Sequence, residues 1–517
     1  MPQSGASALL CENRIDGLLL TLAQPMSRVL PGLPSFRRQL YSRNGGRALT
    51  FCLLLTVSLP SFAQDVHATA PALDQLKRWI AAYDNSNWDI YREFLRTNFA
   101  PEAENIFQAR SVRRQTGAFD LIKVEKQTPN EVVALLNGRD SDKVGQIVVE
   151  VEPADPHRIV KLQARAIPRP ADLALPHLNE SELIASLQQR LNDASSADTF
   201  SGAVLLAKNG KPIFAEAYGF ADREHYVANS LDTRFRMGSM NKMFTAVAIL
   251  QLASAGKLRV DDPVIKYVPD YPNRDLASKV TISELLSHTG GTGDFFGPEF
   301  DGRRLELRTH EDYIKLLGNR PARFEPGSRF EYSNYGFLIL GGVIEKVSGQ
   351  SYYDYVRDHI YRLAAMSLTD SEPEDQRVPG LSVGYTKQEG DLWQRNTFLL
   401  PYRGTSAGGG YSTVGDLLRF ANALHANRLL DKHYTKLLMT GRIDMPFGGR
   451  YAFGFQDRTI NGSHCVGHNG GSPGMNGELD ICQDSEYVIA VLANMDPEAA
   501  SHIAEFIANR LPTPKPS

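Results

Sequence analysis

The feature that most constrains the fold of this chain is a serine and a lysine placed three residues apart at the start of a long apolar run. Ser239 and Lys242 follow Gly238, and the run continues to Ala253 without a glycine or a proline. This pattern predicts a helix that is buried on most sides inside a domain. Positions three apart share one face of a helix, so the hydroxyl and the amine would be neighbours. Burial disfavours the charged form of lysine, and the amine could then accept the proton of the serine.

By itself Ser-x-x-Lys is a weak signal. It occurs about once or twice by chance in a chain of this composition, and serine is also an ordinary N-cap residue of helices. Two later stretches strengthen the catalytic interpretation. The first is Tyr332-Ser333-Asn334, which leads into the apolar segment 337–344. The second is His468-Asn469-Gly470, which lies in the glycine-rich stretch 466–474.

In this order, Ser-x-x-Lys, Tyr-Ser-Asn and His-x-Gly resemble the three motifs of the serine penicillin-recognising superfamily. That superfamily includes class C β-lactamases, DD-peptidases, D-aminopeptidases and the related esterases of the CubicO type. Two flanking stretches, 285–291 and 406–417, are also similar, and the likeness covers about residues 180–512. The resemblance implies an α+β fold, with an antiparallel sheet flanked by helices and a helical insert between its strands. It also implies a serine hydrolase that forms an acyl-enzyme.

The resemblance assigns roles to individual residues. Ser239 would be the acylated nucleophile, Lys242 its activating partner, and Tyr332 the relay that protonates the leaving group. It leaves open whether Lys242 or Tyr332 accepts the first proton. The residues expected to bind the substrate are Asn334, His468, Gly470 and Gly471. The backbone N–H groups of Ser239 and Gly471 would hold the oxyanion, and losing one such donor typically costs about 10²-fold to 10³-fold in rate.

One departure from the superfamily pattern affects the expected substrate. β-Lactamases carry a lysine in the third motif, where its charge meets the carboxylate of the substrate, whereas this chain has His468. Histidine is neutral above about pH 6.5. The sequence therefore favours a peptidase or esterase that acts on amides or esters, with a β-lactamase as the alternative. A penicillin-binding or partner-binding module without turnover is an alternative of another class.

A rival motif lies at 404–408, where Gly-Thr-Ser-Ala-Gly matches the Gly-x-Ser-x-Gly nucleophile elbow around Ser406. That elbow requires a helix directly after the serine, but further glycines follow and the next expected helix starts near Thr413. Asp416 and His468 would have to complete its triad. Of the other histidines, His288 is expected to be structural. No spacing of histidines and cysteines suggests a metal site, and no cofactor is expected.

The N-terminal region is expected to direct export. The chain has 517 residues, with 56 basic and 59 acidic side chains, so no charge signature for nucleic acid is present. The apolar segment 48–63 follows several arginines and ends in a small-x-small site, which predicts a signal peptide within 1–63 that is cleaved after Ala63. It is shorter than the about 20 residues that a spanning helix needs. We therefore expect a periplasmic or secreted protein, with no transmembrane helix in the mature chain and a small-molecule or peptide substrate.

Residues 65–168 are expected to form a separate small α+β domain. Three helical segments are followed by four strands at 119–126, 131–136, 146–151 and 158–166. The pattern is similar to that of NTF2-like domains. A proline-rich linker, 169–178, leads to the catalytic domain, 179–512, which ends in strands 451–456, 464–468, 478–482 and 487–493 and a last helix. Cys465 and Cys482 lie equally far from the centre of one hairpin. This position is compatible with a disulfide and also with two unpaired core thiols.

Overall fold

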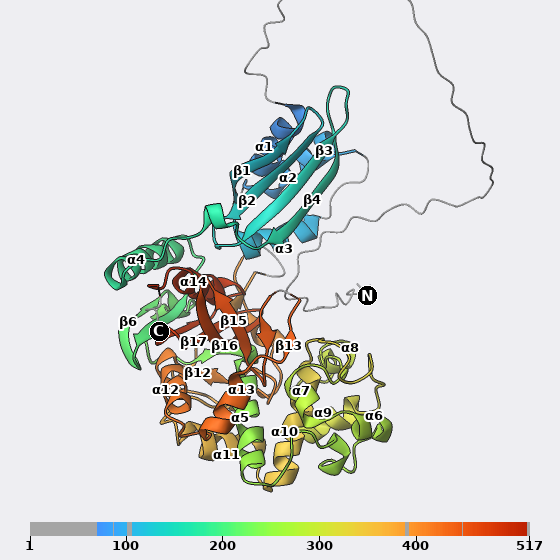
Figure 1. Cartoon of the computed structure of the whole chain (residues 1–517), viewed down its shortest axis with the longest axis vertical. Coiled ribbons are helices and arrows are strands. Elements are labelled where there is room, and N and C mark those ends of the chain that lie inside the picture. The colour runs from blue at the N-terminus through green and yellow to red at the C-terminus, as the bar shows by residue number, and fades with distance from the viewer. Residues whose placement is uncertain (1–69, 86, 101–105, 388–391, 447, 514–517) are drawn as a thin grey trace, which may run out of the picture.

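A computed structural model describes residues 70–85, 87–100, 106–387, 392–446 and 448–513 (Figure 1). The predicted signal peptide, 1–63, lies outside the described residues. Within these ranges, no helix combines the length and the apolar character that crossing a membrane requires.

The first part of the chain folds into helices packed on a four-stranded antiparallel sheet. Its elements are α1 (Pro71–Tyr83), α2 (Trp88–Asn98), α3 (Ile106–Thr116), β1 (Phe119–Gln127), β2 (Glu131–Gly138), β3 (Val144–Val151) and β4 (Ile159–Ile167). The strands pair in the order β1-β2-β3-β4, as a meander. Trp79 and Tyr83 of α1 are buried against Ile147 and Val149 in a core of this part's own. The strand prediction is confirmed to within two residues, and the NTF2-like assignment stays a prediction.

The small domain contacts the larger one through the loop between β2 and β3. Asp142 in this loop accepts two hydrogen bonds from the guanidinium of Arg510, at 2.7 and 3.0 Å, and one from the side chain of Asn509. Arg190 of α4 (Glu180–Ser196) donates to the carbonyl of Asp140 at 2.8 Å. Figure 1 shows the small domain above the larger one, with α14 (Ala499–Ala508) at the junction.

The larger domain is built on an eight-stranded antiparallel sheet whose strands come from both ends of the domain. The order is β13-β14-β15-β16-β17-β18-β5-β6. Its strands are β5 (Gly202–Lys208), β6 (Lys211–Tyr218), β13 (Ile443–Asp444), β14 (Arg450–Tyr451), β15 (Gln456–Ile460), β16 (Ser463–Ser472), β17 (Met475–Cys482) and β18 (Tyr487–Ala493). The short strands outside it are β7 (Phe220–Asp222), β8 (Val227–Ala228), β9 (Phe235–Arg236), β10 (Tyr385–Thr386), β11 (Gln394–Arg395) and β12 (Tyr411–Ser412). The expected α+β architecture is confirmed.

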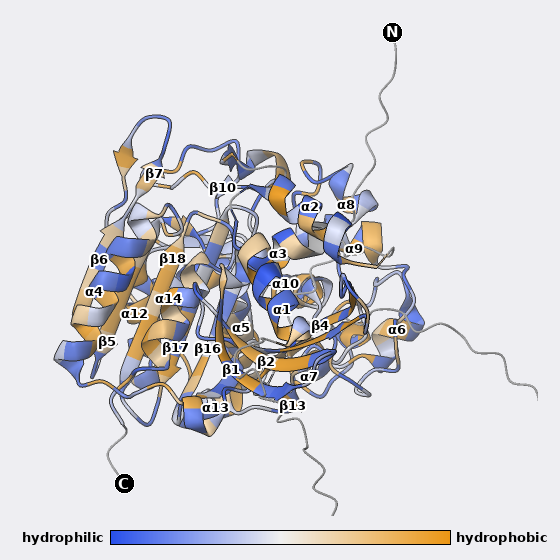
Figure 2. Ribbon diagram, turned by 90° about the horizontal axis from the view of Figure 1, so that it is seen from above, coloured by the Kyte–Doolittle hydropathy of each residue, from blue (hydrophilic) through white to orange (hydrophobic). Residues whose placement is uncertain are grey.

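Helices cover both faces of this sheet, because its central strands are apolar on both sides. On β5, Val204 and Leu206 pack with α4 and α14, whereas Ala203 and Leu205 face the helical insert. Strand β18 alternates in the same way. In Figure 2 both strands are hydrophobic along nearly their whole length, while α4, which covers them, also carries hydrophilic residues. The central sheet is thus the middle of three layers.

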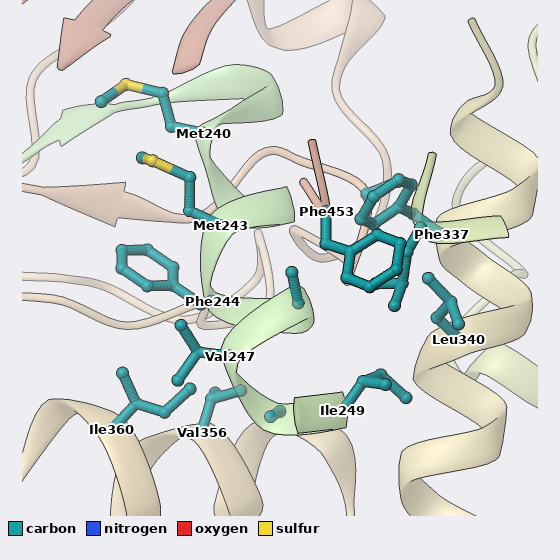
Figure 3. Close-up of a cluster of buried hydrophobic side chains, with 14 of the residues drawn as sticks. Met240, Met243, Phe244, Val247, Ile249, Phe337, Leu340, Val356, Ile360 and Phe453 are labelled. Carbon is teal, nitrogen blue, oxygen red and sulfur yellow. The ribbon is translucent and has the colours of Figure 1, made fainter. Parts of the chain in front are cut away.

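The helical insert surrounds α5 (Asn241–Ser254), the helix predicted from the Ser239 stretch. Figure 3 shows Phe337 and Leu340 packing on one side of α5 and Val356 and Ile360 below it, while Met240 and Met243 lie at its other end. The remaining helices are α6 (Arg274–Lys279), α7 (Ile282–Leu286), α8 (Pro298–Asp301), α9 (His310–Leu317), α10 (Asn334–Ser348), α11 (Tyr352–Val356), α12 (Val414–His425) and α13 (Lys432–Met439). As expected, α5 is buried on almost every side.

The structure corrects one predicted strand and decides one open alternative. The predicted strand 451–456 is broken, because β14 ends at Tyr451 and β15 begins only at Gln456. Gly454 lies between them with φ +68°, and a Cβ atom there would lie 2.7 Å from the carbonyl oxygen of Lys242, so the chain bends where it packs against α5. Cys465 and Cys482 are paired in register across β16 and β17, and they form a disulfide.

Arg458→Met should destabilise the larger domain by about 3–5 kcal/mol, because Arg458 on β15 donates at 2.6 Å to each of two buried carboxylates on β17, Glu478 and Asp480. Burial holds the pKa of Glu478 above its usual range in spite of Arg458, and the variant should raise it further. When folding raises the pKa of a carboxyl group, the folded state becomes less stable relative to the unfolded state as the pH rises and the group ionises. The loss, measured by urea unfolding, should therefore be larger at pH 8 than at pH 5; an equal loss at both would contradict this.

Candidate active site

Ser239 lies in a tight turn directly before α5, where the backbone of β16 comes very close. The turn is the 3₁₀ segment η2 (Gly238–Met240). Gly238 has φ +52°, and a Cβ atom on it would lie 2.8 Å from the backbone nitrogen of Gly471, so only glycine fits without strain. Ser239 remains partly exposed, whereas Lys242 in the first turn of α5 is fully buried. The turn therefore presents the hydroxyl to solvent and the amine to the core.

The amine of Lys242 has three partners from three parts of the chain. Its Nζ atom lies 3.1 Å from Ser239 Oγ, 2.7 Å from Asn334 Oδ1 and 2.6 Å from the carbonyl oxygen of Ala407. Burial lowers the pKa of Lys242 to about 7, and the nearby carboxylate of Asp294 opposes part of this effect. A substantial fraction of the amine is therefore neutral near pH 7.

This arrangement satisfies both protonation states of the amine. A neutral amine has two N–H groups, which donate to Asn334 Oδ1 and to the Ala407 carbonyl, and its lone pair then faces the hydroxyl of Ser239. The hydroxyl donates to Nζ in that state. After protonation, the third N–H donates to Ser239 Oγ, so no buried donor is left without an acceptor. The geometry allows Lys242 to accept the proton of Ser239 and keep its other bonds.

Asn334 is held in the orientation that Lys242 needs. It is the first residue of α10, whose N-cap is Ser333, and the Ser333 hydroxyl accepts from Gly336 N at 2.9 Å. The Nδ2 atom of Asn334 donates to Asp294 Oδ2 at 2.9 Å, which leaves Oδ1 facing Lys242. Burial raises the pKa of the Asp294 carboxyl. Asp294 therefore fixes which end of the amide meets the lysine.

Tyr332 brings its ring beside the amine, as the resemblance implied. Nζ of Lys242 lies 4.8 Å from the centre of the Tyr332 ring. On the other side, the ring of His288 lies 4.2 Å from that of Tyr332, centre to centre, and its Nδ1 atom accepts from Ser333 N at 3.1 Å. His288 thus holds the segment 332–334 in place, which confirms its expected structural role.

The third motif lies on β16 as predicted, but His468 is not on the surface of the cleft. Its Nε2 atom accepts from the hydroxyl of Tyr451 at 2.9 Å, and its Nδ1 atom donates to the carbonyl of Asn469. Burial, together with the charge of Lys242, lowers the pKa of His468 to about 3. The ring is therefore neutral, and Tyr451 and Asn469 take its expected place on the cleft wall.

Gly470 and Gly471 border Ser239, the predicted nucleophile. A Cβ atom at Gly470 would lie 1.9 Å from the carbonyl oxygen of Met237 and 2.9 Å from the backbone nitrogen of Ser239. Both glycines line the cleft together with Ser239. The predicted oxyanion donors, the N–H groups of Ser239 and Gly471, thus belong to two backbone segments in direct contact.

The cleft around Ser239 has an empty volume of about 1250 Å³, counted with the open solvent at its mouth. Its walls come from the turn before α5, the start of α10, β16 and several loops. Among the lining residues are Phe295, Phe296, Phe330, Tyr332, Asn334, Leu399, Leu400, Pro401, Tyr451, Asn469, Met475, Asn476, Glu498 and Ser501. Most of this surface is apolar or uncharged. The described residues contain no group of three or more His, Cys, Asp or Glu that could hold a metal ion.

The rival nucleophile Ser406 is excluded by its surroundings. Its side chain is fully buried and does not line the cleft. The hydroxyl donates to the carbonyl of Phe337 at 2.8 Å. Asp416, its proposed triad partner, instead accepts from Leu368 N and from the hydroxyl of Thr369. The Gly-x-Ser-x-Gly stretch serves to place the Ala407 carbonyl against Lys242.

Three contributors were missed in the sequence. Asp294 lies three residues beyond the flanking stretch 285–291, and nothing local marks it as a partner of Asn334. Ala407 acts through its carbonyl, which no side-chain pattern reveals. Tyr451 was placed in a continuous strand, so its contact with His468 was not expected.

The comparisons with known proteins agree with this geometry. The Beta-lactamase family model matches residues 183–511, which is more than half of the chain. The putative penicillin-binding protein PbpX of Bacillus subtilis is 29% identical over 314 residues, which cover 60% of this chain and 75% of that protein. Among solved structures, a penicillin binding protein from Bacillus halodurans has 32% identity and a TM-score of 0.56, covering 61% of this chain and 97% of that one.

A D-stereospecific amidohydrolase from Streptomyces sp. has 27% identity and a TM-score of 0.54, with 63% of this chain and 98% of that chain covered. The resemblance inferred from the three motifs is confirmed, and the site is of the serine hydrolase kind. The chain belongs to the Beta-lactamase family.

Proposed function

We propose that this protein is an exported serine hydrolase that forms an acyl-enzyme on Ser239 with amide or ester substrates. The observation that carries the proposal is the contact of 3.1 Å between Ser239 Oγ and the Nζ atom of Lys242. The pKa of this buried lysine is about 7. A neutral, fixed amine beside a partly exposed hydroxyl is the arrangement that activates a serine.

The proposed reaction uses the groups around the cleft in turn. Ser239 Oγ attacks the carbonyl carbon of the substrate while its proton passes to Lys242. The N–H groups of Ser239 and Gly471 stabilise the negative charge that develops on the carbonyl oxygen. A proton then reaches the leaving group through Tyr332, and water hydrolyses the acyl-enzyme in a second addition and elimination. Asn334 keeps the lysine in place during both halves.

Peptidase or esterase activity is favoured over β-lactam hydrolysis. The position that carries a lysine in β-lactamases holds His468, which is buried and neutral because its pKa is about 3. It therefore offers no charge to a substrate carboxylate. One similar structure is of a D-stereospecific amidohydrolase, which supports an amide substrate.

Ser239→Ala should abolish acylation and lower kcat/KM by at least about 10⁴-fold, because it removes the hydroxyl that lies 3.1 Å from the amine. Mass spectrometry of the intact protein after incubation with a small ester or a cephalosporin should show an adduct only when Ser239 is present. Ser406→Ala is the matched control and should still be acylated. A lasting adduct with one equivalent of product and no further turnover would support the non-catalytic binding module instead.

The pH profile of kcat/KM should have an acid limb near pH 7. Lys242 must be neutral to accept the proton of Ser239, so activity should rise with pH through its pKa of about 7. Steady-state rates from pH 5 to 9 on a substrate without an ionisable group test this. His468 stays neutral over that range, so a limb that disappears in His468→Gln would contradict the assignment to Lys242.

Asp294→Asn should move the acid limb to lower pH. The carboxylate of Asp294 raises the pKa of Lys242, and the amide removes that charge while it can still accept from Asn334 Nδ2. The pH at half-maximal kcat/KM measures the shift. Asp301→Asn, which removes an exposed carboxylate from α8, is the control and should leave the limb in place. A shift towards higher pH in Asp294→Asn would refute this account of the lysine.

A further inference from the structure

We propose that Glu498 forms a subsite for a cationic group of the substrate, so that preferred substrates combine an ammonium group with an apolar group near the scissile amide or ester. The inference rests on the proposed function of Ser239 and extends it to a substrate class. It assigns to Glu498 a role in selecting substrates by charge, separate from the bond-breaking groups.

The cleft carries a single formal charge on its described walls, and that charge is negative. Of the described residues that line it, Glu498 alone has an ionisable acid or base of the Asp, Glu, Lys, Arg or His type. Lys242 lies behind the surface with all its hydrogens bonded, and His468 lies behind Tyr451. A substrate carboxylate would therefore meet repulsion from Glu498 without a compensating cation on these walls.

The carboxylate of Glu498 is not used to hold the fold together. Glu498 precedes α14 as its N-cap residue, but its side chain makes no cap hydrogen bond. Asn476 on β17 caps the helix instead, because its Oδ1 atom accepts from Ala500 N at 2.6 Å and from Ser501 N at 3.0 Å. Within the part of the chain that the structure describes, Glu498 has no ion pair or side-chain hydrogen bond. The group is thus left available to a ligand.

Glu498 lies on the oxyanion side of the nucleophile. The preceding residue, Pro497, packs on Gly471, where a Cβ atom would lie 2.8 Å from the proline Cγ. Gly471 in turn touches Gly238, the residue before Ser239. Glu498 and Ser239 line the same cleft, so a substrate acylated on Ser239 shares that cleft with the Glu498 carboxylate.

The buried charges of β15 and β17 are paired with one another and leave Glu498 without a cation. Arg458, a buried guanidinium on β15, is already bonded to Glu478 and Asp480. Ser501, which lines the cleft one turn after Glu498, donates its hydroxyl to Glu478 at 2.9 Å. The charge of Arg458 is therefore matched by Glu478 and Asp480 and does not neutralise Glu498.

The other walls define the apolar part of the substrate. Phe295 and Phe296 lie with ring centres 4.2 Å apart beside Asp294, and Phe330 lies 5.8 Å from Tyr451. Leu399, Leu400 and Pro401 line the same cleft. These side chains offer contact area to an aromatic or aliphatic group without hydrogen-bond partners for a polar one.

The test compares three phenylalanine substrates that differ only in the charge at the α-nitrogen: the free amine, the N-acetyl form and the N-succinyl form. Each is prepared in D and L configuration, as a p-nitroanilide and as a thiobenzyl ester. The kcat/KM values at pH 7 are measured for the wild-type protein, Glu498→Gln and Glu498→Lys. The ratio of wild type to variant for each substrate cancels the intrinsic reactivity of that substrate. Asp484→Asn, which removes an exposed carboxylate in the turn between β17 and β18, is the control for a change of net charge.

We expect Glu498→Gln to lower kcat/KM for the free amine by about 5-fold to 10-fold and to leave the N-acetyl substrate within about 2-fold. Glu498→Lys should favour the N-succinyl substrate over the free amine. High salt should shrink the wild-type preference, since salt screens a partly exposed charge pair. Asp484→Asn should behave as wild type.

Equal loss for all three substrates in Glu498→Gln would overturn the proposal and assign Glu498 a structural role at the start of α14. So would a wild-type preference for the N-succinyl form. The proposed function fails in a different way, namely if Ser239→Ala retains the turnover of the wild type or if no substrate forms an adduct on Ser239. The two failures are therefore separable.

Discussion

The site depends on one buried amine that must find a partner for each of its hydrogens. Lys242 has no exposed surface, and an unpaired amine there would carry a large desolvation penalty. Its partners come from α10, from the 404–410 loop and from the turn before α5. Three segments far apart in the sequence must therefore be in register before the lysine is satisfied. The folding of the helical insert against the sheet and the assembly of the nucleophile are consequently one event.

The electrostatics of the cleft follow from the same burial. The lysine of the site, Lys242, is inside the protein near the carboxylate of Asp294, and the histidine of the third motif is neutral and hydrogen-bonded to Tyr451. The surface that a substrate meets is apolar on one side and carries the carboxylate of Glu498 on the other. A fold that surrounds its nucleophile with these walls separates the charge needed for catalysis from the charge that selects the substrate.

The sequence was sufficient for features that local pattern determines. The strands of the small domain, the apolar helix after Ser239 and the order of the three motifs all follow from periodicity or spacing. It was insufficient where contacts join distant segments. The carboxylate of Asp294 accepts from the Asn334 amide, and the backbone carbonyl of Ala407 accepts from Lys242. The bend at Gly454 exists because α5 packs there. No window of sequence contains both members of those pairs.

Helix α14 connects the small domain to the catalytic cleft through side-chain contacts, in addition to the covalent linker between the domains. Its N-terminal end is capped by Asn476 beside Glu498, and Asn509 and Arg510, just beyond its C-terminal end, grip Asp142 of the small domain. Contacts at both ends of α14 therefore couple the position of the small domain to that of the cleft wall. A rotation of the leading domain would break the hydrogen bonds with Asp142 or tilt α14, and a tilt would move Glu498 and Ser501 in the wall of the cleft.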